Sequence, residues 1–336
     1  MKKAILWEKK NSFIQCHLCR HSCMIPEGKT GICGVRINKE GALYSKVWGK
    51  TTGIGIDPIE KKPLFHFYPG SSVLSFGTVG CNFRCMFCQN YTTSQAPREG
   101  RYIEQEDITP EEIIELAKKH DCQSIAYTYN EPTIFLEYAL DCMKLAKKNN
   151  IKNIFVSNGY FSKQTLGLIE PYLDAVNIDL KSFNPEFYSK IVGAKLEGVL
   201  DSLKLVAKTK IWLEVTTLVI PGKNDSPEEM KSIASFVKEE LGEDVPFHIS
   251  AFFPCYKMAD VPSTSAETLV KAKKIAIDEG LKYVYVGNID IERAEDTICP
   301  RCKKTVIKRS RYLIEENNVI GSKCRFCGEK INGVFE

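Results

Sequence analysis

Between about residues 71 and 290, short apolar runs alternate with amphipathic stretches of helical periodicity. Strands that alternate with helices of about ten to sixteen residues indicate βαβ units and a parallel sheet. Two stretches, residues 109–112 and 226–229, place an N-cap residue before a proline and a glutamate, which predicts a helix start at each. The runs expected to form strands are residues 73–76, 124–129, 153–156, 175–180, 211–219, 247–251 and 283–286.

This alternation predicts an α/β fold built as a partial (β/α)6, TIM-like barrel, or a nearly closed one. In such barrels the chemistry lies at the C-terminal ends of the strands. We expect an N-terminal cysteine-rich metal-binding region at residues 1–68, the barrel at 69–292 and a zinc-ribbon domain at 293–336. The proline-punctuated stretch 57–70 is expected to be a linker, with His66 either facing the active site or buried as a structural histidine.

The composition fits a globular protein with one barrel-sized core, because 43% of the 336 residues are hydrophobic and 26% are charged. A net charge of +4 is too mild to argue for nucleic acid by itself. We expect no membrane association, because no apolar run has the length of a membrane span, and the N-terminus lacks a signal peptide. Eleven of the fourteen cysteines fall into three groups with metal-ligand spacing, which indicates a reducing cytoplasm and an oxygen-poor cell.

The central cysteine group follows the first expected strand and has the spacing C-x3-C-x2-C, formed by Cys81, Cys85 and Cys88. A fully ligated cubane cluster takes four cysteines. Three local cysteines leave one iron free for a small molecule. In the same way, catalytic zinc sites keep one coordination position open, whereas structural zinc sites do not. The alternative is a zinc knuckle, which usually has paired C-x2-C units, and no second pair lies nearby. The spacing therefore favours a [4Fe–4S] cluster with an open iron.

A second group, with the spacing C-x2-C-x3-C-x9-C, consists of Cys16, Cys19, Cys23 and Cys33. Four thiolates are enough for a tetrahedral zinc site or for a second iron–sulfur cluster. The C-x2-C start favours zinc and the x3 gap favours a cluster, so both remain open. His17 and His21 are spare ligand candidates, although surface positions suit them better.

The third group has two C-x2-C pairs separated by 21 residues and consists of Cys299, Cys302, Cys324 and Cys327. This is the zinc-ribbon pattern, with a further iron–sulfur cluster as the alternative. The basic stretch 303–312 lies between the pairs. It is either the solvated face of a β-hairpin or a docking surface for nucleic acid or protein.

The central motif Gly80-Cys81-Asn82-Phe83-Arg84-Cys85-Met86-Phe87-Cys88, with Phe87 before the last cysteine, resembles the signature of radical S-adenosylmethionine (SAM) enzymes. From about residue 13 onward the chain resembles the radical SAM component of the AmmeMemoRadiSam gene system, a family related to pyruvate formate-lyase activating enzymes. Three further stretches carry the resemblance, at residues 16–36, 57–70 and 299–335.

The resemblance implies a radical SAM barrel and a [4Fe–4S] cluster on the central cysteines. It also implies reductive cleavage of SAM to a 5′-deoxyadenosyl radical that abstracts a hydrogen atom from a substrate. The electron would come from a donor such as flavodoxin or ferredoxin. The substrate is expected to be a protein, as in glycyl-radical activases. The alternative substrates are RNA or a small molecule. A hypothesis from a different functional class is that the chain is a zinc-binding adaptor protein. No acid–base dyad is expected for SAM cleavage, so the catalytic residues remain unknown.

Residues that match the family at the strand ends are the candidates for holding SAM. Glu131 is expected to receive the ammonium group, Asp179 the ribose and Lys181 the carboxylate, with a surface salt bridge as the alternative for the last two. His248 matches a histidine near SAM, although a packed core histidine fits equally well. Cys255 is a candidate radical relay or, more simply, a buried thiol. The full set of candidates is Phe87, Asn130, Glu131, Ser157, Asn158, Asp179, Lys181 and His248.

Overall fold

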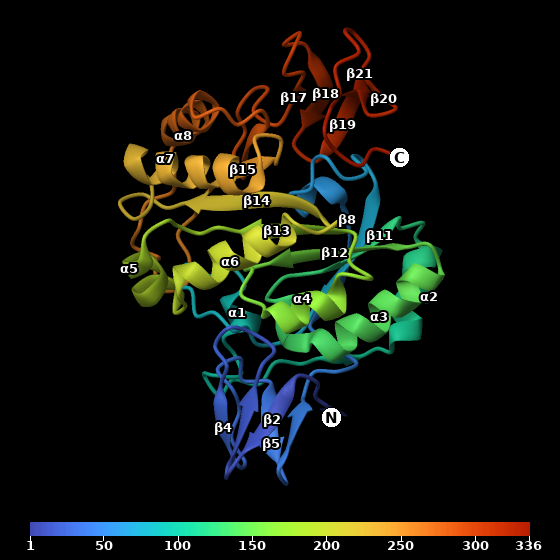
Figure 1. The fold of residues 1–336 in the computed structure, drawn as a ribbon, viewed down its shortest axis with the longest axis vertical. Helices are drawn as coiled ribbons and strands as arrows, with labels where there is room; N and C mark the ends of the chain where they lie inside the picture. The colour runs from blue at the N-terminus through green and yellow to red at the C-terminus, as the bar shows by residue number, and fades with distance from the viewer.

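The computed structural model describes residues 1–336 and shows three regions along its long axis. Small antiparallel sheets of the N-terminal region lie at one end, an α/β body lies in the middle, and the hairpins of the C-terminal region lie at the other end (Figure 1). The two cysteine-rich regions at the chain ends are thus on opposite sides of the body.

The body is built on one eight-stranded sheet with the order β16-β15-β14-β13-β12-β11-β9-β8. Every neighbouring pair is parallel except β8 and β9. The seven predicted strands are confirmed, and each lies within a few residues of its expected position. The strands are β8 (Gly53–Pro58), β9 (Ser72–Gly77), β11 (Ser124–Tyr127), β12 (Lys152–Ser157), β13 (Ala175–Asp179), β14 (Trp212–Val219), β15 (Phe247–Ala251) and β16 (Val284–Gly287).

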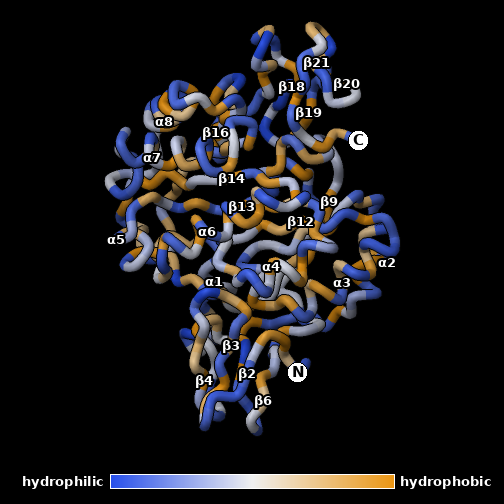
Figure 2. Tube along the Cα trace, in the orientation of Figure 1, coloured by the Kyte–Doolittle hydropathy of each residue, from blue (hydrophilic) through white to orange (hydrophobic).

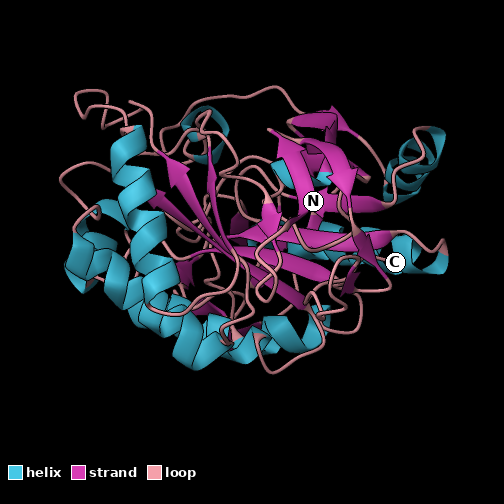
Figure 3. Ribbon diagram, turned by 90° about the horizontal axis from the view of Figure 1, so that it is seen from above, coloured by secondary structure: helices cyan, strands magenta, loops and turns pink.

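The two edge strands, β16 and β8, do not pair with each other, so the sheet is open. Helices line the outside of this fan of strands (Figure 3). The predicted helix starts are confirmed. Thr109 caps α2 in a reciprocal capping box with Glu112, and Ser226 caps α7. The helices are α1 (Tyr91–Ser94), α2 (Pro110–Lys119), α3 (Leu136–Lys148), α4 (Lys163–Ile169), α5 (Pro185–Phe187), α6 (Leu196–Val206), α7 (Pro227–Phe236) and α8 (Ala266–Asp278).

The expectation that residues 57–70 form a linker was wrong. Asp57 and Pro58 belong to β8, which pairs antiparallel with β9, and Phe67 bridges to Val334 near the C-terminus. Proline is compatible with an edge strand, because its missing N–H can face away from the partner strand. His66 is fully buried and hydrogen-bonds Tyr285 and the Asn332 carbonyl, which fits its structural reading.

The N-terminal region consists of short antiparallel sheets with the orders β1-β6-β5 and β2-β3-β4, and β7 pairs with β10. The C-terminal region has the sheets β17-β18-β19 and β20-β21. These strands are β1 (Lys2–Lys3), β2 (Trp7–Lys10), β3 (Phe13–Cys16), β4 (Met24–Pro26), β5 (Arg36–Lys39), β6 (Ala42–Ser45), β7 (Lys50–Thr51), β10 (Glu106–Asp107), β17 (Thr297–Ile298), β18 (Thr305–Ser310), β19 (Leu313–Asn317), β20 (Val319–Ile320) and β21 (Lys323–Cys324).

The main hydrophobic core runs from the strands of the body into the N-terminal region, where Ile14 and Leu18 belong to it. The C-terminal region instead has a core of its own, in which Cys299 and Val306 pack against Phe65 and Tyr285. Hydrophobic segments concentrate along the central strands (Figure 2). None of the helices has the length and apolar character needed to cross a membrane.

Candidate active site and cysteine centres

A cavity of 260 Å³ opens at the C-terminal ends of the parallel strands. The cysteine loop, residues 80–90, follows β9 directly and brings its three thiols into the cavity wall. The opposite wall comes from the ends of β11, β12, β13, β14 and β15. The lining residues are Pro63, Cys81, Phe83, Cys85, Phe87, Cys88, Gln89, Asn90, Ser94, Tyr129, Asn130, Asn158, Asp179, Lys181, Thr216, Leu218, Ser250 and Asn288.

Five of the eight candidate SAM contacts lie in this wall, namely Phe87, Asn130, Asn158, Asp179 and Lys181. The other three, Glu131, Ser157 and His248, do not line it. The structure therefore separates residues that face the cavity from residues that hold the strand ends in place behind it.

Asp179 and Lys181 face the cavity as an ion pair, with 2.9 Å between the Lys181 Nζ and the Asp179 Oδ2. Burial disfavours the Lys181 ammonium, but the charges of Asp179 and Cys85 outweigh it and raise the pKa of Lys181. The ammonium also lies 5.7 Å from the centre of the Phe87 ring. The cavity thus presents one fixed positive and one fixed negative charge beside the three thiols, and burial raises the pKa of the Cys85 thiol to about 12.

The backbone at Lys181 is held in place by two side chains. The Tyr188 hydroxyl accepts the Lys181 N–H at 3.0 Å, and the Asn224 amide donates to the Lys181 carbonyl at 2.7 Å. Sequence reasoning missed both of these positioning roles. The Asn224 role had a local signal, because the motif Ile-Pro-Gly-x-Asn follows β14 in the chain.

Glu131 is fully buried and joins two strand ends instead of facing the cavity. Its carboxylate accepts hydrogen bonds from the Ser157 hydroxyl at 2.9 Å and the Asn158 N–H at 2.8 Å. Thr133 supplies two more donors, its N–H at 3.0 Å and its hydroxyl at 2.5 Å. Burial raises the pKa of Glu131, while these donors favour its charged form. The carboxylate thereby orients Asn158, whose amide reaches the Asn82 Oδ1 at 2.7 Å.

Asn130 anchors the start of the cysteine loop, because its amide donates to the carbonyls of Thr78 and Gly80. Its Oδ1 is buried without a partner, and so is the Nδ2 of Asn82. Buried polar atoms are rarely left unpaired in native proteins. One free acceptor and one free donor beside three thiols fit a bound group that carries an amine and bare sulfur atoms, as SAM on an iron–sulfur cluster does.

Tyr129 has a left-handed backbone with φ of 73°, a conformation that glycine adopts most easily. Its side chain is used elsewhere: the hydroxyl reaches Asp57 at 3.3 Å, and the ring lies under the Lys62 ammonium. Tyr129 thereby ties the strand end to the edge strand β8.

His248 belongs to a buried network below the cavity. It hydrogen-bonds Glu214 at 2.6 Å, and Glu214 also accepts the N–H groups of Phe65 and His66. Burial alone would raise the pKa of Glu214, but the hydrogen bond with His248 outweighs it and lowers that pKa. Burial lowers the pKa of His66 to about 4, so its ring is neutral. Both histidines fit their structural alternatives.

The ribbon cysteines, Cys299, Cys302, Cys324 and Cys327, have sulfur atoms that all lie within 4.8 Å of one another. Cys299 and Cys327 are 3.6 Å apart, and Cys302 and Cys324 are 3.7 Å apart. Four thiolates at 2.3 Å from one tetrahedral zinc ion would be separated by about 3.8 Å. This group therefore has the spacing for a single tetrahedral metal ion.

The basic stretch between these cysteines does not form a uniformly solvated face. The Arg309 side chain is buried, with its guanidinium 4.3 Å from the centre of the Phe65 ring and its Nε 3.8 Å from Glu60. It also donates to the Phe65 carbonyl at 2.8 Å. Lys308 is the exposed neighbour and pairs with Glu315. The stretch thus contributes a buried anchor between the C-terminal region and the body, which weakens its interpretation as a nucleic-acid surface.

The N-terminal cysteine group, Cys16, Cys19, Cys23 and Cys33, converges at one place. Cys16 ends β3, its N–H donates to the Cys23 carbonyl, and a side chain at Gly31 would lie 3.6 Å from the Cys23 sulfur. Burial raises the pKa of Cys19, and the charges of the other three thiols raise it further. His21 lies beside the group without joining it, because its Nε2 contacts the Asn82 carbonyl at 2.8 Å.

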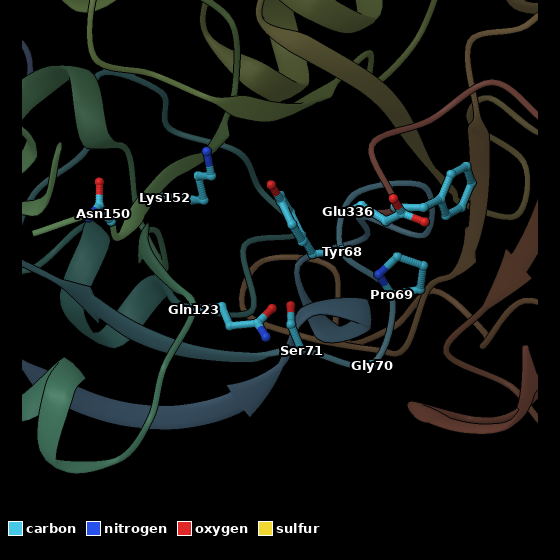
Figure 4. Close-up of a pocket in the computed structure, with 9 residues that line it drawn as sticks. Tyr68, Pro69, Gly70, Ser71, Gln123, Asn150, Lys152 and Glu336 are labelled. Carbon is cyan, nitrogen blue, oxygen red and sulfur yellow. The ribbon is translucent and has the colours of Figure 1, made fainter. Parts of the chain in front are cut away.

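Another cavity, of 510 Å³, lies away from these centres (Figure 4). Its walls include Ser71, Gln123 and Lys152, which stand at the N-terminal ends of β9, β11 and β12. In parallel α/β folds the chemistry sits at the opposite ends of the strands. The smaller cavity with the cysteines is therefore the candidate active site.

Cys255 lies near the cysteine loop but does not line the cavity. Its thiol points at the Cys88 carbonyl from 3.5 Å, and the neighbouring Lys257 N–H donates to the Met86 carbonyl. The segment therefore braces the loop from outside.

These features define a class of protein: an α/β fold with an open three-thiol site at the carboxyl ends of parallel strands. A family model for the radical SAM superfamily matches residues 76–237. The chain belongs to the radical SAM superfamily. Members are enzymes that carry out radical chemistry with a [4Fe–4S] cluster and SAM, so this protein is an enzyme of that kind.

Individual relatives agree with this assignment. An uncharacterized protein of Methanocaldococcus jannaschii is 44% identical over 338 residues, covering all of both chains. A probable GTP 3′,8-cyclase of Thermococcus kodakarensis is 32% identical over 268 residues, covering 72% of this chain and 84% of that protein. A pyruvate formate-lyase-activating enzyme of Clostridium pasteurianum is 23% identical over 210 residues, covering 60% and 87%.

Among solved structures, Streptococcus suis SuiB bound to its precursor peptide SuiA superposes with a TM-score of 0.51 at 14% identity. The match covers 68% of this chain and 51% of SuiB. It supports the fold.

Proposed function

We infer that this protein reductively cleaves SAM and uses the resulting radical to abstract a hydrogen atom from a segment of a protein or peptide substrate. The observation that carries the first part is the cavity in which Cys81, Cys85 and Cys88 face the Asp179–Lys181 pair. When bound there, the [4Fe–4S] cluster supplies the electron that breaks the sulfur–carbon bond of SAM.

The residues of the cavity have distinct tasks in this proposal. The three thiols hold the cluster, and Lys181 binds the carboxylate of SAM by a charge-assisted hydrogen bond. Asp179 accepts hydrogen bonds from the ribose hydroxyls, and the free Asn130 Oδ1 accepts one from the ammonium group. Glu131 acts through Asn158 and is a positioning residue.

A polymeric substrate is supported by a second cavity, of 450 Å³, that shares Gln89 and Asn288 with the first. Its other walls come from Phe253 of the body and from Arg311 and Tyr312 at the tip of the C-terminal hairpin. Phe253 is 45% exposed and Tyr312 is 38% exposed. Exposed aromatic side chains beside a reaction site suit an extended chain that reaches into it. The relationship to an activating enzyme agrees with a protein substrate.

The cyclase relative favours a second candidate, a small nucleotide-like substrate. Such a substrate would be held within the 260 Å³ cavity and would not need the hairpin. Substitution of Tyr312 by Ala therefore separates the two candidates, because it weakens turnover of a polymer and leaves turnover of a small molecule unchanged.

The test of the central claim is production of 5′-deoxyadenosine from SAM under anaerobic, reducing conditions. We expect the wild type to produce it and Cys85→Ala to lose both cluster absorbance and product. Cys122→Ala is the matched control, because Cys122 is a buried thiol outside the cavity and the three cysteine groups. Undiminished product from Cys85→Ala would overturn the assignment.

We extend the proposal to the ribbon cysteines, which we assign a structural zinc ion. The close sulfur spacing supports it. A flavodoxin or ferredoxin is the electron donor in this account.

A further inference from the structure

We propose that the N-terminal cysteine group holds a second iron–sulfur cluster, which lies on the route of the electron from the donor to the cysteine loop. The group itself is independent of the proposed function, whereas the electron route rests on it.

The N-terminal cysteine group differs from the ribbon cysteines in the spacing of its sulfur atoms. The ribbon cysteines are the one group of three or more potential ligand residues whose ligand atoms crowd within 4.8 Å, as a single ion requires. The N-terminal cysteine group does not show this spacing, although its backbone is drawn together where the Cys16 N–H donates to the Cys23 carbonyl at 3.0 Å. In a cubane each thiolate binds a different iron, so the sulfur atoms stand further apart than around one ion. The three thiols of the cysteine loop also lack the crowding within 4.8 Å that the ribbon cysteines show.

The N-terminal cysteine group and the cysteine loop are in direct contact. The Arg98 guanidinium donates at 2.5 Å to the carbonyl of Ile32, the residue before Cys33. The same guanidinium donates to the carbonyls of Cys81 and Phe83. One side chain therefore joins the backbones that carry a thiol of each group.

Two further contacts join the same two segments. A side chain at Gly80 would lie 2.6 Å from the Cys33 carbonyl, so the two backbones pack against each other without side chains between them. On the other side of the loop, His21 contacts the Asn82 carbonyl at 2.8 Å. A site that was only structural would not need to pack against the reactive loop, whereas a site that delivers electrons must be close to it.

The N-terminal cysteine group is partly exposed to solvent. Cys16 and Cys33 are buried, whereas Cys19 and Cys23 are partly exposed. Met24, the residue after Cys23, is 48% exposed. Weak electron-transfer encounters use small contact surfaces. One edge of the group is thus accessible to a donor, and the other edge contacts the cysteine loop.

The proposed step transfers one electron and no atom. A low-potential protein reductant, a ferredoxin or flavodoxin, is oxidised by one electron at the exposed edge. The same electron then arrives at the cluster on Cys81, Cys85 and Cys88, where SAM cleavage consumes it.

The experiment counts metals in the full chain after anaerobic reconstitution with iron and sulfide. Wild type is compared with Cys19→Ala, Cys85→Ala and the control Cys122→Ala. We expect Cys19→Ala and Cys85→Ala each to lose about half of the iron and labile sulfide, since each removes one of two cubanes. Zinc stays constant in all variants. Loss of zinc from Cys19→Ala, or full retention of its iron, would overturn the second cluster.

If Cys19→Ala fails to fold, Cys85→Ala still decides the question, because its change lies outside the N-terminal region. Iron that falls to zero in Cys85→Ala contradicts a second cluster. Electron paramagnetic resonance of reduced Cys85→Ala is expected to show one remaining cluster signal.

The electron route is tested separately by SAM cleavage in Cys19→Ala with two reductants. We expect product with dithionite, which reduces the cysteine-loop cluster directly, and loss of product with reduced flavodoxin. Equal product with both reductants would refute the route and leave the second cluster standing. Absence of product from the wild type with either reductant would instead refute the proposed function.

Discussion

The two four-cysteine groups at opposite ends of the molecule carry the same number of thiols but differ in their surroundings (Figure 1). The ribbon cysteines crowd within 4.8 Å and pack with the separate core of the C-terminal region. The N-terminal cysteine group is more widely spread and shares the main core with the cysteine loop, because Cys16, Cys33, Cys81 and Cys85 all belong to it. We therefore base our two proposals, a structural metal ion in the ribbon and a redox centre in the N-terminal region, on sulfur spacing and neighbouring residues more than on cysteine count.

The largest expected effect comes from removing the ribbon metal. We expect Cys302→Ser to release zinc and unfold residues 293–336 locally, because a structural zinc site contributes about 10–16 kcal/mol of folding free energy. Limited proteolysis and zinc content measure this. Iron content stays at the wild-type value. Loss of iron from Cys302→Ser would break the comparison, since it would place a cluster in the ribbon.

The next effect concerns the joint between the C-terminal region and the body. Arg309→Met leaves Glu60 buried without its counter-charge, which costs about 3–5 kcal/mol of unfolding free energy. Lys308→Met is the matched control, because this exposed lysine pairs with Glu315 on the surface, a contact worth about 0–1 kcal/mol. Denaturant unfolding measures both. Equal losses in the two variants would show that Arg309 is no anchor.

The corresponding joint on the N-terminal side is Arg98. Arg98→Met removes hydrogen bonds from a charged donor, each worth about 1.5–3 kcal/mol. We expect slower flavodoxin-driven SAM cleavage with both clusters still present. Arg101→Met is the control, because Arg101 lies nearby but bonds only Glu99 and the carbonyls of Tyr91 and Thr92. Unchanged flavodoxin-driven cleavage in Arg98→Met would show that the Arg98 hydrogen bonds are not needed for the electron route.

The smallest effect is a pH dependence on the ribbon side alone. Burial raises the pKa of Glu295 from 4.5 to about 7, and the charge of Asp290 adds to it. Between these values the folded state binds more protons than the unfolded state, so stability falls as pH rises. We expect Glu295→Gln to flatten this fall between about pH 4.5 and 7 in unfolding experiments. The exposed Glu292→Gln serves as the control, and a fall that persists in Glu295→Gln would contradict the assignment.

Local patterns in the sequence were enough for the parallel strands and the helix caps. A strand of the sheet and the cap of a helix are each encoded within a few neighbouring positions, as at the helix caps Thr109 and Ser226. β8 was not recognised, because proline and glycine obscure its pattern and its pairing with β9 is set by the body. The three cysteine groups were found from spacing alone.

Sequence patterns pointed to residues of which five line the cavity, but they did not predict the individual contacts. Glu131 stands in the expected motif, yet its direction depends on Thr133, Ser157 and Asn158, which come from two strand ends. Arg98 could not be predicted, because the carbonyls it joins lie 66, 17 and 15 residues away in the chain. Such contacts exist only after the fold brings the segments together.

Metal analysis of the anaerobically reconstituted full chain tests the contrast between the two cysteine groups most directly. We predict about eight iron ions, in two [4Fe–4S] clusters, and about one zinc ion per chain. About four iron ions and two zinc ions per chain would contradict it, because the N-terminal cysteine group would then be a second structural zinc site.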